Sequence, residues 1–372
     1  METDTNTGRL ADRLADLGAR VDLDRPIGEL TTLRTGGPAD LLVACDSTEV
    51  LVEVLRGLDA AGVPVLLLGG GSNVVVSDAG FRGAVVRIVS SGLRIDGDTV
   101  VADAGVVWDD AVRRSVEAGV GALECLSGIP GAVGATPVQN VGAYGVEVAE
   151  LIRRVHLFDR ESGSSRWAAP EELGFAYRTS VLKGRSRLVV LAVEFGGRAD
   201  GLSAPLRYRE LAAAMGAEAG ERRPAAAVRD RVLALRRGKG MVLDPEDRDT
   251  YSVGSFFTNP IIAAADAPAA IERAARVSGA DAVPQYPAAD GAVKLSAAWL
   301  IERAGFHKGY PAAGGRARLS TKHTLALTNA DAAATADILA LAAEVRDGVA
   351  ERFGITLEPE PVLVGVELPP VG

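Results

Sequence analysis

The chain contains few of the residues that build metal sites and disulfide frameworks. Its 372 residues include two cysteines, Cys45 and Cys125, and three histidines, His156, His307 and His323. Two cysteines are too few for a disulfide framework or a cysteine-based zinc site, and so few histidines exclude a histidine-rich metal centre. The HExxH motif of zinc proteases does not occur. We therefore expect no bound metal and a chain suited to a reducing compartment.

A basic surface and a long apolar run are also missing. The formal net charge is −9, which argues against an extended nucleic-acid interface because such an interface needs positive charge. We expect no membrane-spanning helix, because no uncharged apolar run reaches about 18 residues. The opening METDTNTGRLADRLADLG is acidic and lacks the basic-then-apolar order of a secretory signal. These absences predict a cytoplasmic protein with neither nucleic-acid nor membrane partners.

The residues that are present describe a globular chain with alternating strands and helices. Apolar residues make up 48% and charged residues 24% of it, as in an ordinary protein of two or three domains. Segments rich in valine and leucine predict strands at 63–69, 84–90, 99–105 and 187–195. Apolar residues at helical spacing predict helices at 49–62, 108–120, around 228–235 and at 336–354.

Two of these helices carry end signals. Asp46, followed three residues later by Glu49, predicts the start of the first helix by analogy with the capping box. Gly354 predicts the end of the last helix, because glycine is the usual residue just past a helix C-terminus. A strand-like tail at 355–368 follows.

A glycine triplet stands inside the stretch LLLGGGSNVVVSD at 66–78. It does not fit the dinucleotide fingerprint GxGxxG, because Val74 occupies the third glycine position, and no lysine follows to make a Walker loop. Successive glycine amides can form an anion-binding nest, since glycine adopts positive φ without strain. A hairpin turn is the alternative, and the spacing alone leaves both interpretations open.

A second glycine-rich stretch, SGIPGAVGATPVQNVGAYG, spans 127–145. Its side chains are too small to pack a core, but its backbone can lie close against a flat group. A glycine-rich loop between domains is the alternative interpretation. Two such loops in one region of strands and helices fit a large cofactor that has both a pyrophosphate and a ring system.

With TLRTGGPAD at 32–40, these stretches resemble the UDP-N-acetylenolpyruvoylglucosamine reductases, also called UDP-N-acetylmuramate dehydrogenases. These flavoenzymes finish UDP-N-acetylmuramate in bacterial cell-wall synthesis. The resemblance runs from about 31 to 366 and rests on motifs in a fixed order, RTGGPAD, LGGGSN, IPGAVGATPVQNVGAYG, FAYRTS, GSFFTNP, VKLSAAWLIERAGF, KHTLALTN and LEPE. It implies FAD as cofactor, NADPH as hydride donor and the enolpyruvyl ether of UDP-N-acetylglucosamine as substrate, in a pathway that supports cell shape and division.

The resemblance also implies an α+β fold. An FAD-binding region of the vanillyl-alcohol-oxidase (PCMH) type would span 20–235, with its two subdomains divided near 85. A substrate-binding domain would span 236–350, and a C-terminal strand at 351–372 would return to the active site. We expect the FAD to be non-covalent, because no histidine that could tether it precedes His156. The sequence leaves the oligomeric state open and is compatible with a monomer.

Three catalytic residues are implied by the resemblance. Arg178 in FAYRTS would stabilise the enolate charge that develops near the flavin edge, and Ser255 in GSFFTNP would act as general acid. Glu360 in LEPE would assist proton delivery. Without the motifs, Arg178 would be a surface ion-pair partner and Ser255 a turn or cap residue. Glu358 is an alternative to Glu360, because residues two apart on a strand face the same side.

The binding residues follow from the same motifs. The predicted cofactor contacts are Gly69, Gly70, Gly71, Ser72, Asn73, Gly128, Ile129, Gly134, Ala135, Gln139, Asn140 and Gly142. The predicted substrate contacts are Tyr177, Tyr208, Lys239, Asn259 and His323. The ammonium of Lys239 suits a diphosphate, and Tyr208 resembles a loop tyrosine that covers the substrate in one subtype of the family. For His323, a packed polar residue before a strand is the alternative.

Three other functions fit parts of the sequence. A flavin oxidase of the same fold is one, although GSFFTNP and the final glutamate pair argue against it. A non-catalytic protein that binds nucleotide sugars is another. A flavin-free Rossmann dehydrogenase is the third, and Val74 weakens it.

Overall fold

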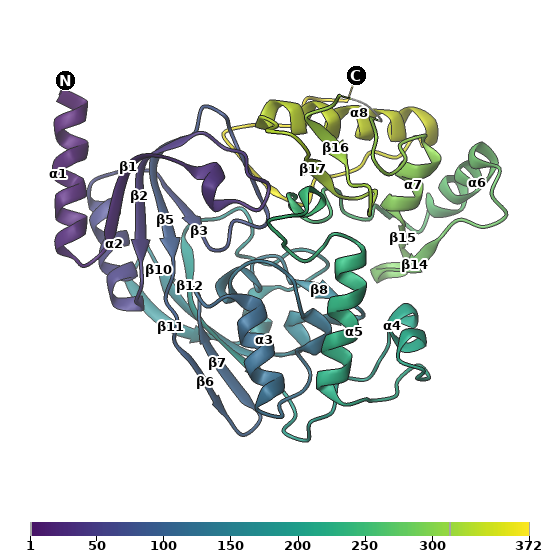
Figure 1. Cartoon of the computed structure of the whole chain (residues 1–372), viewed down its shortest axis with the longest axis horizontal. Helices are drawn as coiled ribbons and strands as arrows, with labels where there is room; N and C mark the ends of the chain where they lie inside the picture. The colour runs from purple at the N-terminus through teal and green to yellow at the C-terminus, as the bar shows by residue number, and fades with distance from the viewer. Residues whose placement is uncertain (1, 312–313, 372) are drawn as a thin grey trace. The chain divides into compact units, whose positions relative to one another are not determined.

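The computed structural model describes residues 2–311 and 314–371, which form two compact units. Unit 1 comprises Met1–Ile27, Pro38–Gly71 and Gly80–Val242, and unit 2 comprises Gly28–Gly37, Ser72–Ala79 and Leu243–Gly372. Both units combine helices with mostly antiparallel or mixed strands (Figure 1), which confirms the predicted α+β class. Each unit is assembled from three separate stretches of the chain, so the units do not follow one another in sequence.

One sheet of unit 1 has four strands in the order β1-β2-β5-β3. Their bounds are Arg20–Pro26 for β1, Pro38–Cys45 for β2, Val65–Leu68 for β3 and Phe81–Ile88 for β5. Strand β1 is antiparallel to β2, whereas β2 and β3 both run parallel to β5. Helix α1 (Glu2–Asp16) lies beside β1 (Figure 1), and helix α2 (Thr48–Ala60) makes the crossover that parallel strands require.

Helix α2 shows how the sequence pattern becomes structure. Its buried face consists of Leu51, Val54, Leu55 and Leu58, the spacing that places apolar residues on one side of a helix. The predicted start at Asp46 is wrong by one residue. Ser47 is the N-cap, and its hydroxyl oxygen accepts a hydrogen bond from the Val50 amide at 3.2 Å. Both residue types cap helices well, so capping preference alone does not choose between them.

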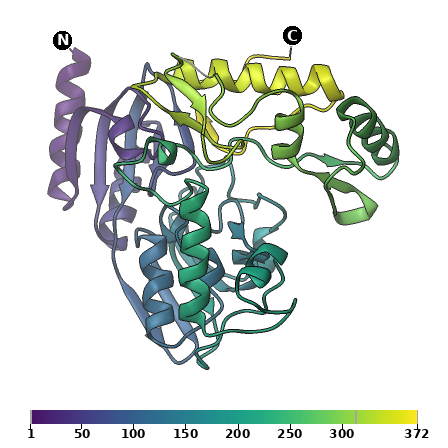
Figure 2. The ribbon, with the colours of Figure 1, turned by 45° about the vertical axis from the view of Figure 1, so that its right-hand side comes forward.

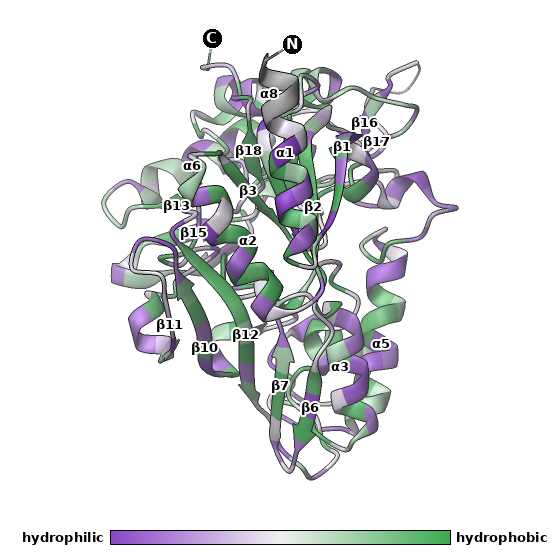
Figure 3. Ribbon diagram, turned by 90° about the vertical axis from the view of Figure 1, so that its left-hand side faces the viewer, coloured by the Kyte–Doolittle hydropathy of each residue, from purple (hydrophilic) through white to green (hydrophobic). Residues whose placement is uncertain are grey.

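The second sheet of unit 1 has five antiparallel strands in the order β11-β10-β12-β7-β6. Their bounds are Leu93–Asp96 for β6, Thr99–Asp103 for β7, Ile152–Asp159 for β10, Ser164–Ala168 for β11 and Leu188–Gly196 for β12. Figure 3 shows the apolar run along β12, which is buried over most of its length. The predicted strands at 63–69, 84–90, 99–105 and 187–195 are confirmed as β3, β5, β7 and β12.

Three helices and a short ribbon complete unit 1. The helices are α3 (Trp108–Glu117), α4 (Arg209–Ala214) and α5 (Ala225–Gly238), and the ribbon pairs β8 (Gly142–Ala143) with β9 (Val146–Glu147). Helices α3 and α5 lie side by side, as Figure 2 shows. The predicted helices at 108–120 and around 228–235 are thereby confirmed.

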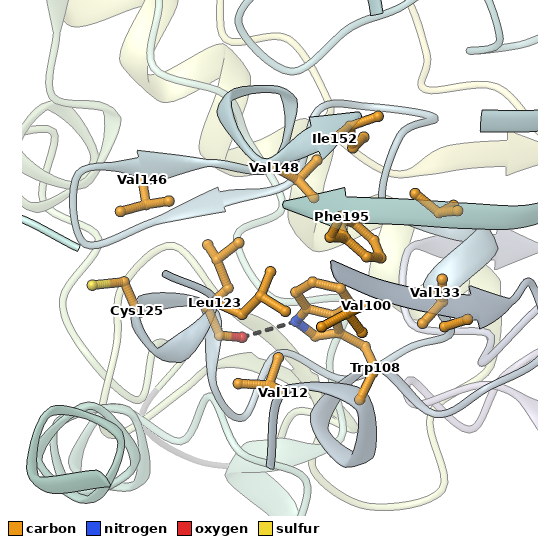
Figure 4. Close-up of a cluster of buried hydrophobic side chains, with 14 of the residues drawn as sticks. Val100, Trp108, Val112, Leu123, Cys125, Val133, Val146, Val148, Ile152 and Phe195 are labelled. Atoms are coloured by element: carbon orange, nitrogen blue, oxygen red, sulfur yellow. Dashed lines mark hydrogen bonds between the residues drawn. The ribbon is translucent and has the colours of Figure 1, made fainter. Parts of the chain in front are cut away.

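A large apolar core fills unit 1 between the five-stranded sheet and these helices (Figure 4). The indole of Trp108 meets the ring of Phe195 edge-on, with 5.5 Å between centroids, and its Nε1 donates a 2.9 Å hydrogen bond to the Leu126 carbonyl oxygen. This bond satisfies the polar atom of a buried aromatic residue. Both cysteines are buried, and burial raises the pKa of the Cys45 thiol to about 12 and raises that of Cys125 as well. They are therefore apolar core residues.

The described residues of unit 2 form three small sheets and three α-helices. Strand β4 (Val74–Val76) runs parallel to β18 (Val362–Val364). The other strands are β13 (Ile261–Ile262), β14 (Gln285–Pro287) and β15 (Val293–Leu295) in one sheet, and β16 (Ala317–Leu319) and β17 (Leu327–Asn329) in the other. The helices are α6 (Ala267–Ser278), α7 (Ala297–Arg303) and α8 (Thr335–Phe353).

The C-terminal part of unit 2 matches its prediction at the helix and departs from it in the tail. Helix α8 ends at Gly354, whose φ of 66° is the left-handed value expected there. The strand-like tail predicted at 355–368 contains only β18. Pro359 and Pro361 lack the amide donors that would extend a strand through this tail. No helix in the described part of the chain is both long and apolar enough for a membrane span.

Candidate active site

The first glycine loop lies between strands that have different partners. Before the loop, β3 pairs with β5 inside unit 1, and after it β4 pairs with β18 inside unit 2. A hairpin requires its two flanking strands to pair with each other. The hairpin interpretation of this stretch is therefore wrong, and the loop interpretation remains.

Within unit 1, the loop glycines approach the second glycine segment, 127–145. A Cβ atom on Gly70 would lie 2.6 Å from the Cα atom of Gly131, and one on Gly69 would lie 3.2 Å from the Cβ atom of Ala132. Gly71 has a φ of 61°, which only glycine adopts without strain. Among the described residues, 2–311 and 314–371, no protein acceptor takes a hydrogen bond from the backbone N–H groups of Gly69, Gly70 and Gly71. Adjacent unhindered N–H groups of this kind suit a phosphate.

The second glycine segment already uses several of its amides to hold its own shape. The amide of Gly128 donates to Asp109 Oδ1 at 2.6 Å, and the amide of Gly134 donates to the Ala104 carbonyl oxygen at 2.8 Å. A Cβ atom on Gly134 would lie 2.5 Å from that of Ala104. Gly128 and Gly134 therefore let the backbone pack closely, and their amides are committed to the fold. Of the other predicted contacts here, Ile129, Gln139 and Gly142 are partly buried and Ala135 is exposed.

Asn140 connects the second glycine segment to the loop that carries Arg178. Its side-chain Nδ2 donates to Glu147 Oε2 at 2.7 Å and to the Ala176 carbonyl oxygen at 3.2 Å, and its Oδ1 accepts from the Ala149 amide at 3.1 Å. Three such bonds lock both ends of the amide. The contacts that the structure shows for Asn140 are those of a positioning residue.

Arg178 sits at the tip of a tight turn. Ala176 and Thr179 exchange two backbone hydrogen bonds, at 3.1 and 3.2 Å, which leaves Tyr177 and Arg178 between them. Arg178 has a φ of 54°, an uncommon value for a residue with a side chain. Its Nη2 donates to the Gly142 carbonyl oxygen at 2.9 Å. Strained backbone at a charged residue motivates a functional hypothesis, and the catalytic role of Arg178 stays a prediction.

Tyr208 and Lys239 belong to one cluster of unit 1. The rings of Tyr208 and Tyr144 meet edge-on with 5.4 Å between centroids. Lys239 Nζ lies 2.7 Å from Glu210 Oε2 and 5.9 Å from the centroid of the Tyr144 ring. Burial raises the pKa of the Tyr144 phenol to about 12, so it is neutral at physiological pH. The predicted diphosphate ligand Lys239 thus has a carboxylate partner in this structure.

In unit 2, backbone hydrogen bonds bring Ser255 and Glu360 onto neighbouring segments. The amide of Glu360 donates to the carbonyl oxygen of Phe256 at 2.8 Å, and the amide of Val362 donates to that of Asn73 at 3.0 Å. The Asn73 side chain also donates to the Glu360 carbonyl oxygen, at 3.5 Å. The Glu360 segment therefore runs between the residue after Ser255 and the end of the first glycine loop, next to Ser72. Arg178, by contrast, belongs to unit 1.

The remaining predicted residues of unit 2 have contacts of their own. Asn259 Oδ1 accepts a hydrogen bond from the Ala297 amide at 2.9 Å, at the start of α7. His323 Nδ1 accepts one from the Leu325 amide at 3.1 Å, so its neutral ring carries the proton on Nε2. Glu358 is exposed, whereas Glu360 is half-buried.

Sequence reasoning missed two charged residues near these groups. Glu210 was not recognised because its ion pair with Lys239 spans 29 positions and no motif contains both residues. Arg236 stands just after the predicted helix around 228–235, and the sequence patterns predicted no role for it. Its Nη2 donates to the Met241 carbonyl oxygen at 2.7 Å, and its buried Nε has no hydrogen-bond partner among the described residues. Burial lowers the pKa of Arg236 to about 10, so it stays charged at neutral pH.

The residues of the two glycine segments fit FAD. Three unused glycine amides suit the pyrophosphate, and a neighbouring segment with few side chains suits a flat ring system. Arg236 adds a positive charge beside Gly128, where a Cβ atom would lie 3.5 Å from its Nε. No group of three potential metal ligands occurs among the described residues.

The contact between the glycine segments gives a test of the cradle. We expect Gly70→Ala to purify with much less flavin than the parent. The new Cβ atom would lie 2.6 Å from the Cα atom of Gly131, so one of the two glycine segments must move away from the other and open the loop. The measurement is the ratio of flavin to protein absorbance. Gly57→Ala is the matched control, since its Cβ would make only ordinary contact with Leu14, at 3.6 Å. A Gly70→Ala protein with full flavin content would contradict the assignment.

Two family models match the chain. The FAD binding domain matches residues 39–168, and the UDP-N-acetylenolpyruvoylglucosamine reductase C-terminal domain matches residues 244–364. The first match contains both glycine segments, and the second contains Ser255 and Glu360. The two matched regions follow each other along the chain and together include most of the predicted site.

Curated relatives and a solved structure agree with these matches. The reductase of that name from Nocardia farcinica is 64% identical over 356 residues, which is 95% of this chain and 92% of the relative. That from Mycolicibacterium smegmatis is 59% identical over 92% of this chain and 95% of the relative. The crystal structure of UDP-N-acetylenolpyruvylglucosamine reductase from Thermus caldophilus covers 93% of this chain and 99% of its own, at 26% identity and a TM-score of 0.63.

Proposed function

The chain belongs to the family of UDP-N-acetylenolpyruvoylglucosamine reductases, and from this membership we propose that Arg178, Ser255 and Glu360 carry its reaction. The protein is an FAD-dependent oxidoreductase with the FAD-binding fold of the vanillyl-alcohol-oxidase type. It reduces the enolpyruvyl group of UDP-N-acetylenolpyruvoylglucosamine with NADPH, which yields UDP-N-acetylmuramate for peptidoglycan synthesis. The observation that carries this function is the 64% identity over 95% of the chain.

The FAD-holding residues come from the two glycine segments. When bound, FAD supplies hydride transfer from NADPH to C3 of the enolpyruvyl group. The amides of Gly69, Gly70 and Gly71 would hold its pyrophosphate, and the backbone of 127–145 would lie against its ring system. We propose that it is held without a covalent bond. His156, the first histidine in the chain, is stacked on Trp167 with 4.9 Å between ring centroids.

The chemical step then needs one proton and stabilisation of one negative charge. Ser255 would donate its hydroxyl proton to C2 of the enolpyruvyl group, since a carbanion-like carbon is basic enough to take it. The fixed guanidinium of Arg178 would stabilise the enolate charge of the substrate carboxylate region. Glu360 would assist proton delivery from the segment beside Ser255.

The backbone pairing supports Glu360 over Glu358 for this role. The Glu360 amide donates to the carbonyl oxygen of the residue that follows Ser255, at 2.8 Å. Glu358 is exposed and its carbonyl oxygen accepts from the Thr258 amide at 3.0 Å, further along the same pairing. A half-buried carboxylate acts more strongly on a reacting group than an exposed one does, because water screens its charge less.

Substrate binding would involve Tyr177, Tyr208, Lys239, Asn259 and His323. Lys239 would bind the diphosphate as a compact point charge. Asn259 uses its Oδ1 to hold the start of α7, which leaves its amide protons to donate to the sugar nucleotide. Because NADPH and nucleotide sugars are water-soluble metabolites of the cell interior, we place the reaction in the cytoplasm.

An anaerobic two-step spectrum tests the function. We expect the purified protein to be yellow and NADPH to bleach the flavin band. Addition of UDP-N-acetylenolpyruvoylglucosamine should then restore the band with one equivalent of UDP-N-acetylmuramate formed. UDP-N-acetylglucosamine, which lacks the enolpyruvyl group, is the control and should leave the band bleached. If the flavin band stays bleached after UDP-N-acetylenolpyruvoylglucosamine is added, the proposed function is wrong.

A further inference from the structure

Residues 197–224 form a strap on unit 1 that joins β12 to α5 and carries Tyr208. Its first part is fixed by buried contacts. The amide of Gly201 donates to the Gly119 carbonyl oxygen at 2.9 Å, and the amide of Ala204 donates to Oε1 of Glu124 at 2.7 Å. Glu124 is fully buried and Leu206 packs into the core with no exposed surface. Up to Leu206, the strap is therefore a rigid part of unit 1.

The tip of the strap, residues 207–210, is held by weaker contacts. Arg207 pairs with Glu150 at 2.9 Å and Glu210 pairs with Lys239 at 2.7 Å. All four side chains are between 35% and 61% exposed, and exposed ion pairs of this kind contribute little to stability. The tip can therefore exchange partners without disturbing the anchored part of the strap.

Two interactions favour a positive charge at Lys239, the dipole of α5 and the ring of Tyr144. Lys239 caps the C-terminus of α5, where the helix dipole is negative, and it lies over the face of Tyr144. Its ammonium can bind the Glu210 carboxylate or a diphosphate. Both at once would place two anions within a few ångströms of each other, where they repel.

We infer that Glu210 competes with the substrate diphosphate for Lys239 and thereby sets the affinity for the sugar nucleotide. The inference rests on the proposed diphosphate-binding role of Lys239. Without substrate, the carboxylate neutralises the lysine and holds the tip, with Tyr208, on unit 1. When the diphosphate takes the ammonium, Glu210 is released, while Tyr208 keeps its contact with the ring of Tyr144 and the hydrogen bond that its carbonyl oxygen accepts from the Ala212 amide at 2.9 Å. Glu210 is thus a positioning residue that acts through Lys239.

Steady-state kinetics of the holoenzyme test this competition. Glu210→Gln keeps the size of the side chain and removes its charge, so we expect KM for the sugar nucleotide to fall about two- to five-fold with kcat unchanged, the range set by an exposed pair. The dissociation constant of UDP, measured by titration of the flavin spectrum, should fall by the same factor. Glu150→Gln is the matched control: it loosens the same tip without touching Lys239 and should change neither value.

Three results separate the possible failures. If Glu210→Gln leaves KM unchanged or raises it, Glu210 is no competitor and the inference is wrong. If Glu150→Gln lowers KM equally, looseness of the tip rather than charge competition explains the effect, and the inference is again wrong. If Lys239→Met leaves KM unchanged in an enzyme that still turns over, the diphosphate role of Lys239 fails and the inference fails with it. In a Lys239→Met background, the effect of Glu210→Gln should disappear.

Discussion

Replacement of Ser255 by alanine should slow turnover of the sugar nucleotide by about 10²–10⁴-fold, the usual contribution of a general acid. Reduction of the flavin by NADPH should proceed at the parent rate, because this half of the reaction delivers no proton to the enolpyruvyl C2 atom. The two halves are measured separately in an anaerobic stopped-flow instrument, by bleaching with NADPH and then by recovery of the flavin band with substrate. The expected variant bleaches normally and recovers slowly.

A neighbouring serine provides the control for this experiment. Ser252 lies on the same segment of unit 2, and its Oγ accepts a hydrogen bond from the Gly254 amide at 3.1 Å. Ser252→Ala removes a structural contact from that segment but no proton donor, so it should lower the melting temperature more than the turnover number. If Ser255→Ala recovers the flavin band at nearly the parent rate, Ser255 is not the acid. If both variants slow recovery equally, the segment's shape rather than its hydroxyl matters.

Local sequence patterns predicted the elements that owe their form to local forces. The buried face of α2 repeats at helical spacing, and α8 ends at Gly354 because glycine adopts the left-handed conformation there. The N-cap of α2 was placed at Asp46 and not at Ser47, since both residue types satisfy the first amides of a helix. Errors of this size are expected where two adjacent residues offer the same chemistry.

Pairings between distant segments could not be predicted in this way. Strand β4, which follows the first glycine loop, pairs with residues 362–364. Nothing in the sequence Val74, Val75, Val76 indicates that this is its partner strand. Strand preference reports how well a side chain fits a sheet, not which strand it joins. The spacing alone left the choice between a hairpin and a phosphate loop open, and the resemblance favoured the phosphate loop. The pairing of β4 with β18 is what excludes the hairpin.

The residues of the candidate site also fall into two groups, those that sequence motifs indicate and those that only the fold reveals. Ser255, Arg178 and Glu360 stand in recognisable motifs, so the resemblance indicated them. Glu210 and Glu124 stand in no such motif, and each acts on a segment far along the chain: the carboxylate of Glu124 binds the Ala204 amide 80 positions away. Charged groups that position other residues are visible only once the fold has brought them together.

Glu360→Gln should lower kcat and kcat/KM for the sugar nucleotide together by about 10²–10³-fold, the loss typical when one preorganised electrostatic group is removed from a reaction centre. A parallel fall in both constants indicates an interaction made in the transition state and not in substrate binding. The glutamine side chain has the same size as the glutamate side chain. The substitution also leaves in place the hydrogen bond from the backbone N–H of residue 360 to the Phe256 carbonyl oxygen. The fold should therefore be unchanged, as circular dichroism and the flavin content can show.

Glu358→Gln is the comparison that decides between the two carboxylates. Glu358 and Glu360 flank Pro359, which pairs with Phe257, but Glu358 is exposed and Glu360 is half-buried. An exposed carboxylate that contacts no reacting group should be replaceable with less than about a twofold change in either constant. The reverse pattern, with a large loss for Glu358→Gln and almost none for Glu360→Gln, would move the second carboxylate of the site to position 358. Equal large losses would mean that both charges act on the proton transfer, because neither could then replace the other.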